Sequence, residues 1–207
     1  MARSDDLHSL PPDLPVPVDD GACAHLPGME LPDLALPSTS GRQVGLGALG
    51  PGWTILYCYP RTGTPDQDPP GGLAAWDSIP GARGCTPQSC AYRDHHRDLQ
   101  ALGAQVFGLS TQTTAYQREM ATRLHLPFEV LSDADLRFAA ALRLPTFTVA
   151  GQTVIQRLTL LTRGGRIEAC FYPVFPPDAD AVRVEEWLRA HVSLTAAGSS
   201  ACPARRA

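Results

Sequence analysis

Hydrophobic and polar positions along the chain alternate between strand-like and helix-like patterns. Residues 53–59, Trp-Thr-Ile-Leu-Tyr-Cys-Tyr, are β-branched and aromatic and stop at Pro60, which predicts a buried strand. Shorter strands are expected at 106–109 and 128–131. Residues 158–162 and 167–172 flank the turn Arg-Gly-Gly-Arg, and this arrangement predicts a β-hairpin.

Apolar residues at helical spacing predict helices between these strands. A helix is expected after Cys85, ending near Gly103, and others are expected near Thr114, Asp133 and Asp178. The residues that carry the helical spacing are Ala91, His95, Leu99, Leu102, Tyr116, Met120, Leu124, Leu136, Ala140, Val184, Trp187 and Leu188. Strand–helix alternation followed by a hairpin and a closing helix predicts an α/β sandwich with a central mixed sheet.

The chain has room for one generous domain. It has 207 residues, and a domain takes roughly 150. Residues 1–28 are rich in proline and aspartate without periodicity and are expected to form an extended arm. The folded domain is expected over 29–194, with a long Pro- and Gly-rich loop at 66–83 and a flexible tail at 195–207.

Composition excludes several classes of function. All 17 basic residues are arginine, against 21 acidic residues, which gives a net charge of −4. Without lysine there is no Schiff-base or phosphate-loop chemistry. A mildly acidic chain without a basic run is not expected to bind nucleic acid. No apolar run approaches the ~20 residues of a membrane span, and no signal-peptide core is seen, so we expect a cytoplasmic protein.

Six cysteines in a reducing compartment are not expected to form a disulfide scaffold. Cys58 and Cys170 lie in apolar strands and are expected to pack, and Cys23 and Cys202 lie in the terminal segments as incidental thiols.

Cys85 and Cys90 form a pair in a different setting. Pro87 suits the first turn of a helix, which places Cys85 at a helix N-terminus, where unpaired N–H groups and the helix dipole stabilise a thiolate. Five residues at 100° each put the two side chains about 140° apart. Their Cα atoms are then about 8.6 Å apart on an intact helix, whereas a disulfide tolerates about 7 Å. The sequence therefore predicts that disulfide formation requires local unwinding.

Two other interpretations of this pair remain open. Both cysteines could be small buried hydrophobic residues. They could instead belong to a zinc site with His95 or His96, although a Cys-x4-Cys spacing is long for such a site and no second cysteine pair follows.

A wider set of residues resembles the active-site loop of peroxiredoxins, closest to the bacterioferritin-comigratory or Q-type branch. The resemblance rests on Tyr-Pro-Arg-Thr-Gly-Thr-Pro at 59–65 and Gly-Cys-Thr-Pro-Gln-Ser-Cys at 84–90. It extends over about residues 29–193, through the Leu-Pro-Asp-Leu-Ala-Leu, Phe-Gly-Leu-Ser, Leu-Ser-Asp and Arg-Leu-Thr-Leu-Leu segments.

The resemblance implies a thioredoxin-like fold and a thiol peroxidase that reduces hydrogen peroxide or organic hydroperoxides. Cys85 would be the peroxidatic and Cys90 the resolving cysteine, with Thr64, Arg157 and Pro60 completing the site. A thioredoxin-like or other dithiol would be the reductant, no metal or organic cofactor would be needed, and the protein would be a monomer or homodimer. A dithiol oxidoreductase or redox sensor, and a zinc-stabilised binding module, are the alternative functions.

The chain departs from the family pattern at three points. Residues 66–83 separate Pro65 from Gly84, where the family has none, and Gln88 stands where many members have glutamate. The Pro-Thr-Phe segment at 145–147 is a rival to the Arg157 region in the alignment. We favour Arg157 because a strand and a Gly-Gly turn follow it.

Overall fold

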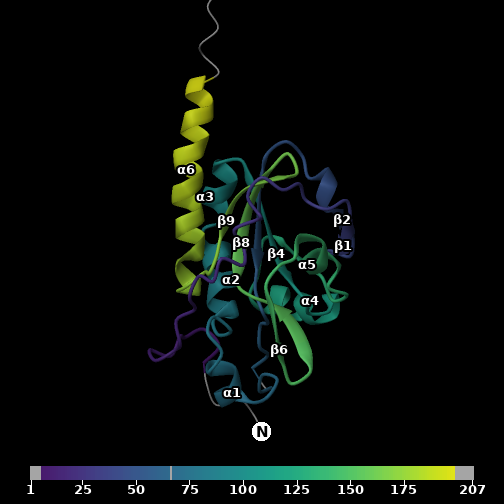
Figure 1. Cartoon of the computed structure of the whole chain (residues 1–207), viewed down its shortest axis with the longest axis vertical. Helices are drawn as coiled ribbons and strands as arrows, with labels where there is room; N and C mark the ends of the chain where they lie inside the picture. The colour runs from purple at the N-terminus through teal and green to yellow at the C-terminus, as the bar shows by residue number, and fades with distance from the viewer. Residues whose placement is uncertain (1–5, 66, 199–207) are drawn as a thin grey trace, which may run out of the picture.

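A five-stranded mixed sheet forms the centre of the protein (Figure 1). The computed structural model describes residues 6–65 and 67–198, with the backbone alone over 193–198. The strand order is β5-β4-β3-β8-β9, in which β3, β4 and β5 are parallel and β8 and β9 run antiparallel to their neighbours. The strands are β3 (Trp53–Cys58), β4 (Ala104–Ser110), β5 (Glu129–Ser132), β8 (Leu158–Arg163) and β9 (Arg166–Phe171).

Helices and two small hairpins surround this sheet. The helices are α1 (Leu73–Asp77), α2 (Cys85–Asp94), α3 (His96–Ala101), α4 (Thr114–Arg123), α5 (Arg137–Leu142) and α6 (Asp180–Gly198), with short 3-10 turns at Leu46–Ala48 and Pro177–Ala179. The hairpins are β1 (Ala35–Pro37) with β2 (Gln43–Gly45) and β6 (Thr146–Val149) with β7 (Gln152–Ile155). No helix of the described residues is long and apolar enough to cross a membrane.

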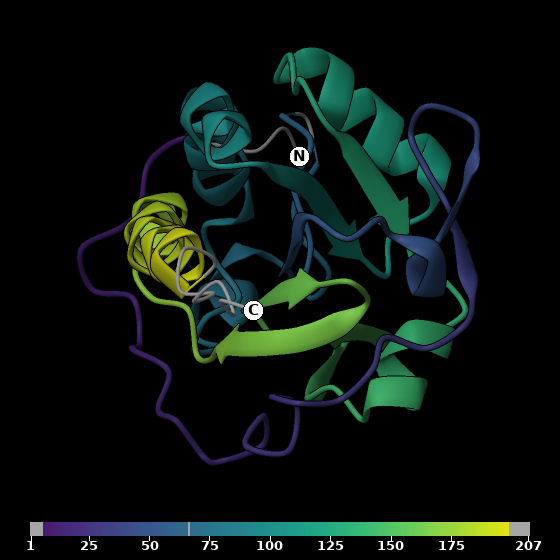
Figure 2. The ribbon, with the colours of Figure 1, turned by 90° about the horizontal axis from the view of Figure 1, so that it is seen from above.

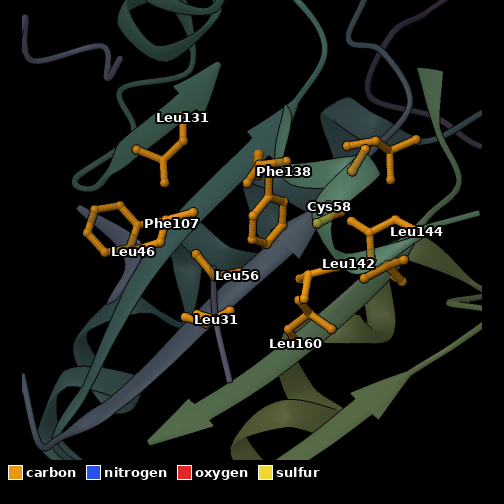
Figure 3. Close-up of a cluster of buried hydrophobic side chains, with 14 of the residues drawn as sticks. Leu31, Leu46, Leu56, Cys58, Phe107, Leu131, Phe138, Leu142, Leu144 and Leu160 are labelled. Atoms are coloured by element: carbon orange, nitrogen blue, oxygen red, sulfur yellow. The ribbon is translucent and has the colours of Figure 1, made fainter. Parts of the chain in front are cut away.

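The alternation of side chains along β3 builds two apolar layers, one on each face of the sheet. Trp53, Ile55 and Tyr57 pack with residues of α2, α3, α4 and α6. Leu56 and Cys58 point to the opposite face and pack with α5 and the N-terminal segment. Figure 3 shows this second layer, where strand residues meet Phe107, Leu131, Phe138, Leu142 and Leu160. Burial on both faces explains why β3 is continuously apolar rather than alternating.

The expected fold class is confirmed, and the differences lie in local detail. The single helix expected from Cys85 to Gly103 is two helices, because the chain turns at His95 between α2 and α3. The sequence analysis did not predict β6–β7. The last helix continues to Gly198, beyond the start of the expected tail, and residues 199–207 lie outside the described residues.

The described part of the N-terminal arm is packed against the domain. Figure 2 shows it passing around the side that carries α6 before it reaches the edge of the sheet. There Gly28 donates its backbone N–H to Ile167 of β9 at 2.7 Å, and Leu26 is fully buried. Cys23, expected to be an incidental thiol, is also buried in the core. The arm therefore covers part of the apolar layer that α5 leaves open.

Strand register brings the candidate site residues to one edge of the sheet. Cys58, the last residue of β3, pairs with Leu158, the first residue of β8. The residues after Cys58 and the residue before Leu158 therefore meet. Pro60 and Arg157, almost a hundred positions apart in sequence, are brought together in this way at the carboxyl end of β3.

Truncating the centre of the apolar layer is expected to destabilise the fold. Leu56 is fully buried, so Leu56→Ala should lower the free energy of unfolding by about 2–5 kcal/mol, measured by urea denaturation. Val18 is 81% exposed, so Val18→Ala serves as a control that should change it by less than about 0.5 kcal/mol. Equal effects of the two substitutions would contradict the assigned core.

Candidate active site

Cys85 is the first residue of α2 and is almost completely buried, with 3% of its surface exposed. The helix begins there because Gly84 adopts a left-handed conformation, with φ of 96°. A Cβ at Gly84 would lie 2.4 Å from Pro177, so glycine alone fits this close approach. The first turn of a helix carries unpaired N–H groups and the positive end of the helix dipole, and Cys85 lies at that position in α2.

Arg157 places a guanidinium directly on this sulfur. Its Nη2 lies 3.2 Å from Cys85 Sγ and donates to the carbonyl of Arg83 at 2.9 Å. Arg157 is only 3% exposed, and it occupies this position because it immediately precedes β8. The rival segment at 145–147 instead leads into the β6–β7 hairpin. The structure thus brings Arg157, the favoured of the two candidates, to Cys85.

Gln88 links this guanidinium to a buried carboxylate. The Nη1 of Arg157 donates to Gln88 Oε1, and Gln88 Nε2 donates to Asp180 Oδ2 at 2.9 Å. The same carboxylate oxygen accepts from Tyr92 Oη at 2.8 Å and Thr159 Oγ1 at 2.7 Å. A glutamine meets both needs at position 88, because its amide offers an acceptor to the cation and a donor to the anion.

Cys90 lies five residues further along the same helix and is half-buried. Burial raises the pKa of its thiol, and the positive charge of Arg93 partly offsets that effect. The arm reaches this side chain, because His8 Nδ1 lies 3.9 Å from Cys90 Sγ. Both cysteines are free thiols in an intact helix, so the separation of about 8.6 Å expected from ideal helix geometry applies to them.

Pro60 and Thr64 lie in the loop that follows β3. Pro60 is buried at the end of the strand. The Thr64 Oγ1 atom is buried and has no hydrogen-bond partner among the described residues. The loop itself is held at Thr62, whose backbone N–H donates to Gln112 Oε1 at 3.0 Å and whose carbonyl accepts from Tyr116 Oη at 3.1 Å. A buried hydroxyl without a partner can accept a bond from an incoming ligand.

A small cavity opens beside Cys85. Arg61, Thr62, Arg83, Cys85 and Tyr116 are among the residues that line it. Thr64 is not among its lining residues. Further walls come from the loop at 66–83 and from the N-terminal arm. The cavity has guanidinium groups, hydroxyls and a thiol, which suit a small polar molecule that accepts hydrogen bonds.

The structure groups the histidines differently from the zinc hypothesis. His95 Nδ1 lies 2.8 Å from Glu185 Oε2. In the described part of the chain His95, Asp98 and Glu185 form the group with metal-ligand spacing, and neither cysteine belongs to it. Arg189 also binds Glu185 and already balances its charge. Among the described residues, neither Cys85 nor Cys90 groups at metal-ligand spacing with His95 or His96, as the zinc hypothesis requires.

The remaining cysteines mostly occupy packed positions. Cys58 is fully buried, and burial raises the pKa of its thiol well above the ordinary value. Cys170 is partly buried against the same core cluster, and a thiol–thiol hydrogen bond with Cys23 is the main cause of its raised pKa. Cys202 lies outside the described residues.

Sequence reasoning missed the supporting residues of the site. It noted Gln88 only as a departure from a motif and did not connect it to Asp180, which is 92 positions away. The signal available was that Gln88 lies three residues after Cys85, on the same face of α2. No local pattern marks Asp180, because an aspartate at a helix start usually acts as a cap.

Asp180 should give the fold an unusual dependence on pH. Its burial raises the pKa of its carboxyl group in the folded state, although the hydrogen bonds and Arg157 oppose the shift. Its contribution to stability is therefore largest below the ordinary aspartate pKa and falls as pH rises toward the raised value, by at most about 1.4 kcal/mol per pH unit. Urea unfolding across this range, compared with non-titrating Asp180→Asn, measures the contribution. A wild-type free energy of unfolding that rises with pH relative to that of Asp180→Asn would contradict the prediction.

Comparison with known proteins gives a consistent result. The Redoxin family model matches residues 26–186. Peroxiredoxin Q, chloroplastic, of Arabidopsis thaliana is 25% identical over 163 residues, which are 79% of this chain and 67% of that protein. A putative peroxiredoxin bcp of Coxiella burnetii is 30% identical over 108 residues, 52% of this chain and 60% of that protein.

Solved structures extend the likeness to the fold. The crystal structure of peroxidoxin BcpB from Mycobacterium tuberculosis superposes with a TM-score of 0.65 at 25% identity and covers 80% of this chain and 98% of that one. The Xanthomonas campestris peroxiredoxin Q structure has a TM-score of 0.60 at 21% identity and covers 87% of this chain and 99% of that one. The chain therefore belongs to the redoxin family, with a thioredoxin-like fold, and within it to the peroxiredoxin Q and bcp type of thiol-dependent peroxidase.

Proposed function

We propose that Cys85 is the peroxidatic cysteine and Cys90 the resolving cysteine of this peroxidase, acting on hydrogen peroxide or organic hydroperoxides. One observation carries the assignment. The buried guanidinium of Arg157 lies 3.2 Å from the Cys85 sulfur, which is at the N-terminus of a helix and beside a polar cavity. A thiolate, a fixed cation and space for a substrate are the parts that peroxide reduction needs.

The first step oxidises Cys85. Its thiolate attacks one peroxide oxygen, an S–O bond forms, and the O–O bond breaks. The sulfur loses two electrons and becomes a sulfenic acid, and the other oxygen leaves as hydroxide or alkoxide, which takes up the proton released by the Cys85 thiol and becomes water or an alcohol. Arg157 donates planar, permanently charged N–H groups toward the charge that develops on the leaving oxygen. The resemblance to peroxiredoxins assigns Thr64 to orient the peroxide and Pro60 to shield the site from water. Pro60 is buried at the end of β3, and the unpartnered Thr64 hydroxyl lies outside the cavity lining, so the loop after β3 has to adjust for it to reach the peroxide.

The second step joins the two cysteines. The Cys90 sulfur attacks the Cys85 sulfenic acid, an S–S bond forms, and the hydroxyl leaves as water. Both residues lie in one helix, so α2 unwinds locally before they can come within disulfide distance. The half-buried Cys90 has a raised thiol pKa while α2 is intact. Unwinding removes the burial that raises it, which makes Cys90 a better nucleophile at the moment it is needed.

The third step needs an external reductant. A dithiol of the thioredoxin kind attacks the Cys85–Cys90 disulfide, takes up its oxidation as its own disulfide, and returns both thiols to the chain. None of these three steps draws on a metal ion or organic cofactor. Cys90 is the more accessible of the two sulfurs in the folded chain.

Replacing the two cysteines separates the steps. Cys85→Ser should abolish peroxide consumption, because serine offers no thiolate. Cys90→Ser should consume about one equivalent of peroxide and then stop, because the sulfenic acid cannot be resolved. Peroxide loss with thioredoxin as reductant, and mass spectrometry of the oxidised protein, measure both outcomes.

Cys58→Ser is the control for these variants, since Cys58 faces the apolar layer away from α2. It should retain turnover. Full activity of Cys85→Ser would overturn the assignment. So would wild-type protein in which no Cys85–Cys90 disulfide forms after one equivalent of peroxide.

Arg157 should matter through both its charge and its shape. Arg157→Ala should slow the reaction of Cys85 with peroxide by about 10²–10³-fold, as for removal of one preorganised donor. Arg157→Lys should recover part of this loss, because it restores the charge without the planar fork. Stopped-flow single-turnover rates give the comparison. Arg163→Ala, at the far end of β8 and exposed, should react at the wild-type rate, and an equal loss there would remove the specific role of Arg157.

A further inference from the structure

We propose that the loop at 67–77 and the N-terminal arm restrict the cavity beside Cys85 to hydrogen peroxide and similarly small hydroperoxides, and that Trp76 is the residue that sets this limit. The proposal rests on Cys85 being the peroxidatic cysteine. It assigns a substrate class to that site and a role to two segments that the catalytic steps do not use.

The loop and the arm form one side of the cavity. Pro69 and Trp76 line it from the loop, and Leu7 lines it from the arm. Tyr116 and Cys85 itself line the same cavity. The two segments are about sixty positions apart in sequence, and both line this cavity. The loop and the arm thus add the apolar groups of Leu7, Pro69 and Trp76 to a cavity that Gln67 and Asp68 of the same loop also line.

The Trp76 wall is fixed in place. Trp76 is 3% exposed and packs in a small apolar cluster with Ala82 and Val149. Its ring lies 6.1 Å from that of Phe147. The loop is therefore anchored on the β6–β7 hairpin by a core of its own, separate from the two main layers.

A chain of polar contacts joins the loop to the arm. Arg83 Nη1 lies 3.0 Å from Asp77 Oδ1, at the end of α1, and Arg83 Nη2 donates to the backbone carbonyl of Asp6 at 3.4 Å. The Arg83 side chain is only 6% exposed. Arg83 thus joins α1 to the arm directly before the helix start at Gly84. Neither wall can move outward without breaking one of these two partly buried hydrogen bonds.

The space that remains is small. The cavity offers about 20 Å³ to the centre of a water molecule, and one buried water needs roughly 10–15 Å³ by the same measure. Hydrogen peroxide is only one oxygen larger than water. An aryl or lipid hydroperoxide would have to displace the indole of Trp76, at the cost of the apolar cluster that holds it.

Trp76→Ala tests this limit. The experiment measures second-order rate constants for hydrogen peroxide and cumene hydroperoxide on the full chain, with Cys85 oxidation as the readout. Wild type should prefer hydrogen peroxide by about tenfold or more, and Trp76→Ala should raise the cumene-to-hydrogen-peroxide ratio by at least about tenfold. Trp76→Phe should fall between the two. Trp187→Ala makes the same truncation on α6, outside the cavity lining, and should keep the wild-type ratio.

A second variant covers the case in which Trp76→Ala does not fold. Leu7→Ala opens the cavity from the arm and should also raise the ratio, whereas Leu10→Ala, which does not line the cavity, should not. A wild-type protein that reduces both peroxides equally fast would overturn the size limit. So would folded Trp76→Ala and Leu7→Ala proteins whose cumene-to-hydrogen-peroxide ratio equals that of Trp187→Ala. A wild-type protein that reduces neither would instead overturn the proposed function.

Discussion

The buried guanidinium of Arg157 is the contact on which the rest of the site depends. Taking an arginine out of water costs several kcal/mol unless its N–H groups are satisfied. Here the carbonyl of Arg83, the amide of Gln88 and the sulfur of Cys85 accept from its two terminal nitrogens, and its Nε has no hydrogen-bond partner among the described residues. The carbonyl fixes the backbone just before α2, and the amide fixes the first turn. One side chain thereby positions the helix start, and the helix start positions the thiol.

The negative charge that balances the Arg157 guanidinium lies on Asp180, which does not contact it directly. Asp180 touches Gln88 rather than Arg157, and three donors, two on α2 and one on β8, hold its carboxylate. A glutamate at position 88 would put two carboxylates side by side in a buried setting, and one would be forced to take up a proton. The glutamine avoids this conflict, so the departure from the family motif and the buried aspartate are two parts of one arrangement.

Much of the fold was predictable because its signals are local, whereas the site was predictable only in part. The apolar run at 53–59, the Gly-Gly turn and the proline in the first turn of α2 each depend on near neighbours in sequence. The likeness to peroxiredoxins then pointed to Arg157, and the pairing of Cys58 with Leu158 explains why it reaches the thiol. Asp180 and Trp76 could not be found in this way, because their partners are set by tertiary packing and no periodicity records them.

The catalytic cycle and the stability of α2 make opposing demands on the same few residues. Peroxide reduction needs an intact first turn, since the helix start holds the Cys85 sulfur 3.2 Å from the Nη2 of Arg157. Disulfide formation needs that turn undone. Three features hold this part of α2 in place: Gly84 at the N-cap, the hydrogen bond of Gln88 to Asp180, and, beyond the first turn, the contact of His8 with Cys90. Strengthening any of them favours the first step and slows the second. Because α2 also contributes Cys85 and Tyr92 to the apolar layer on one face of the sheet, the unwinding has to stay local, at a lower cost than unfolding of the whole domain.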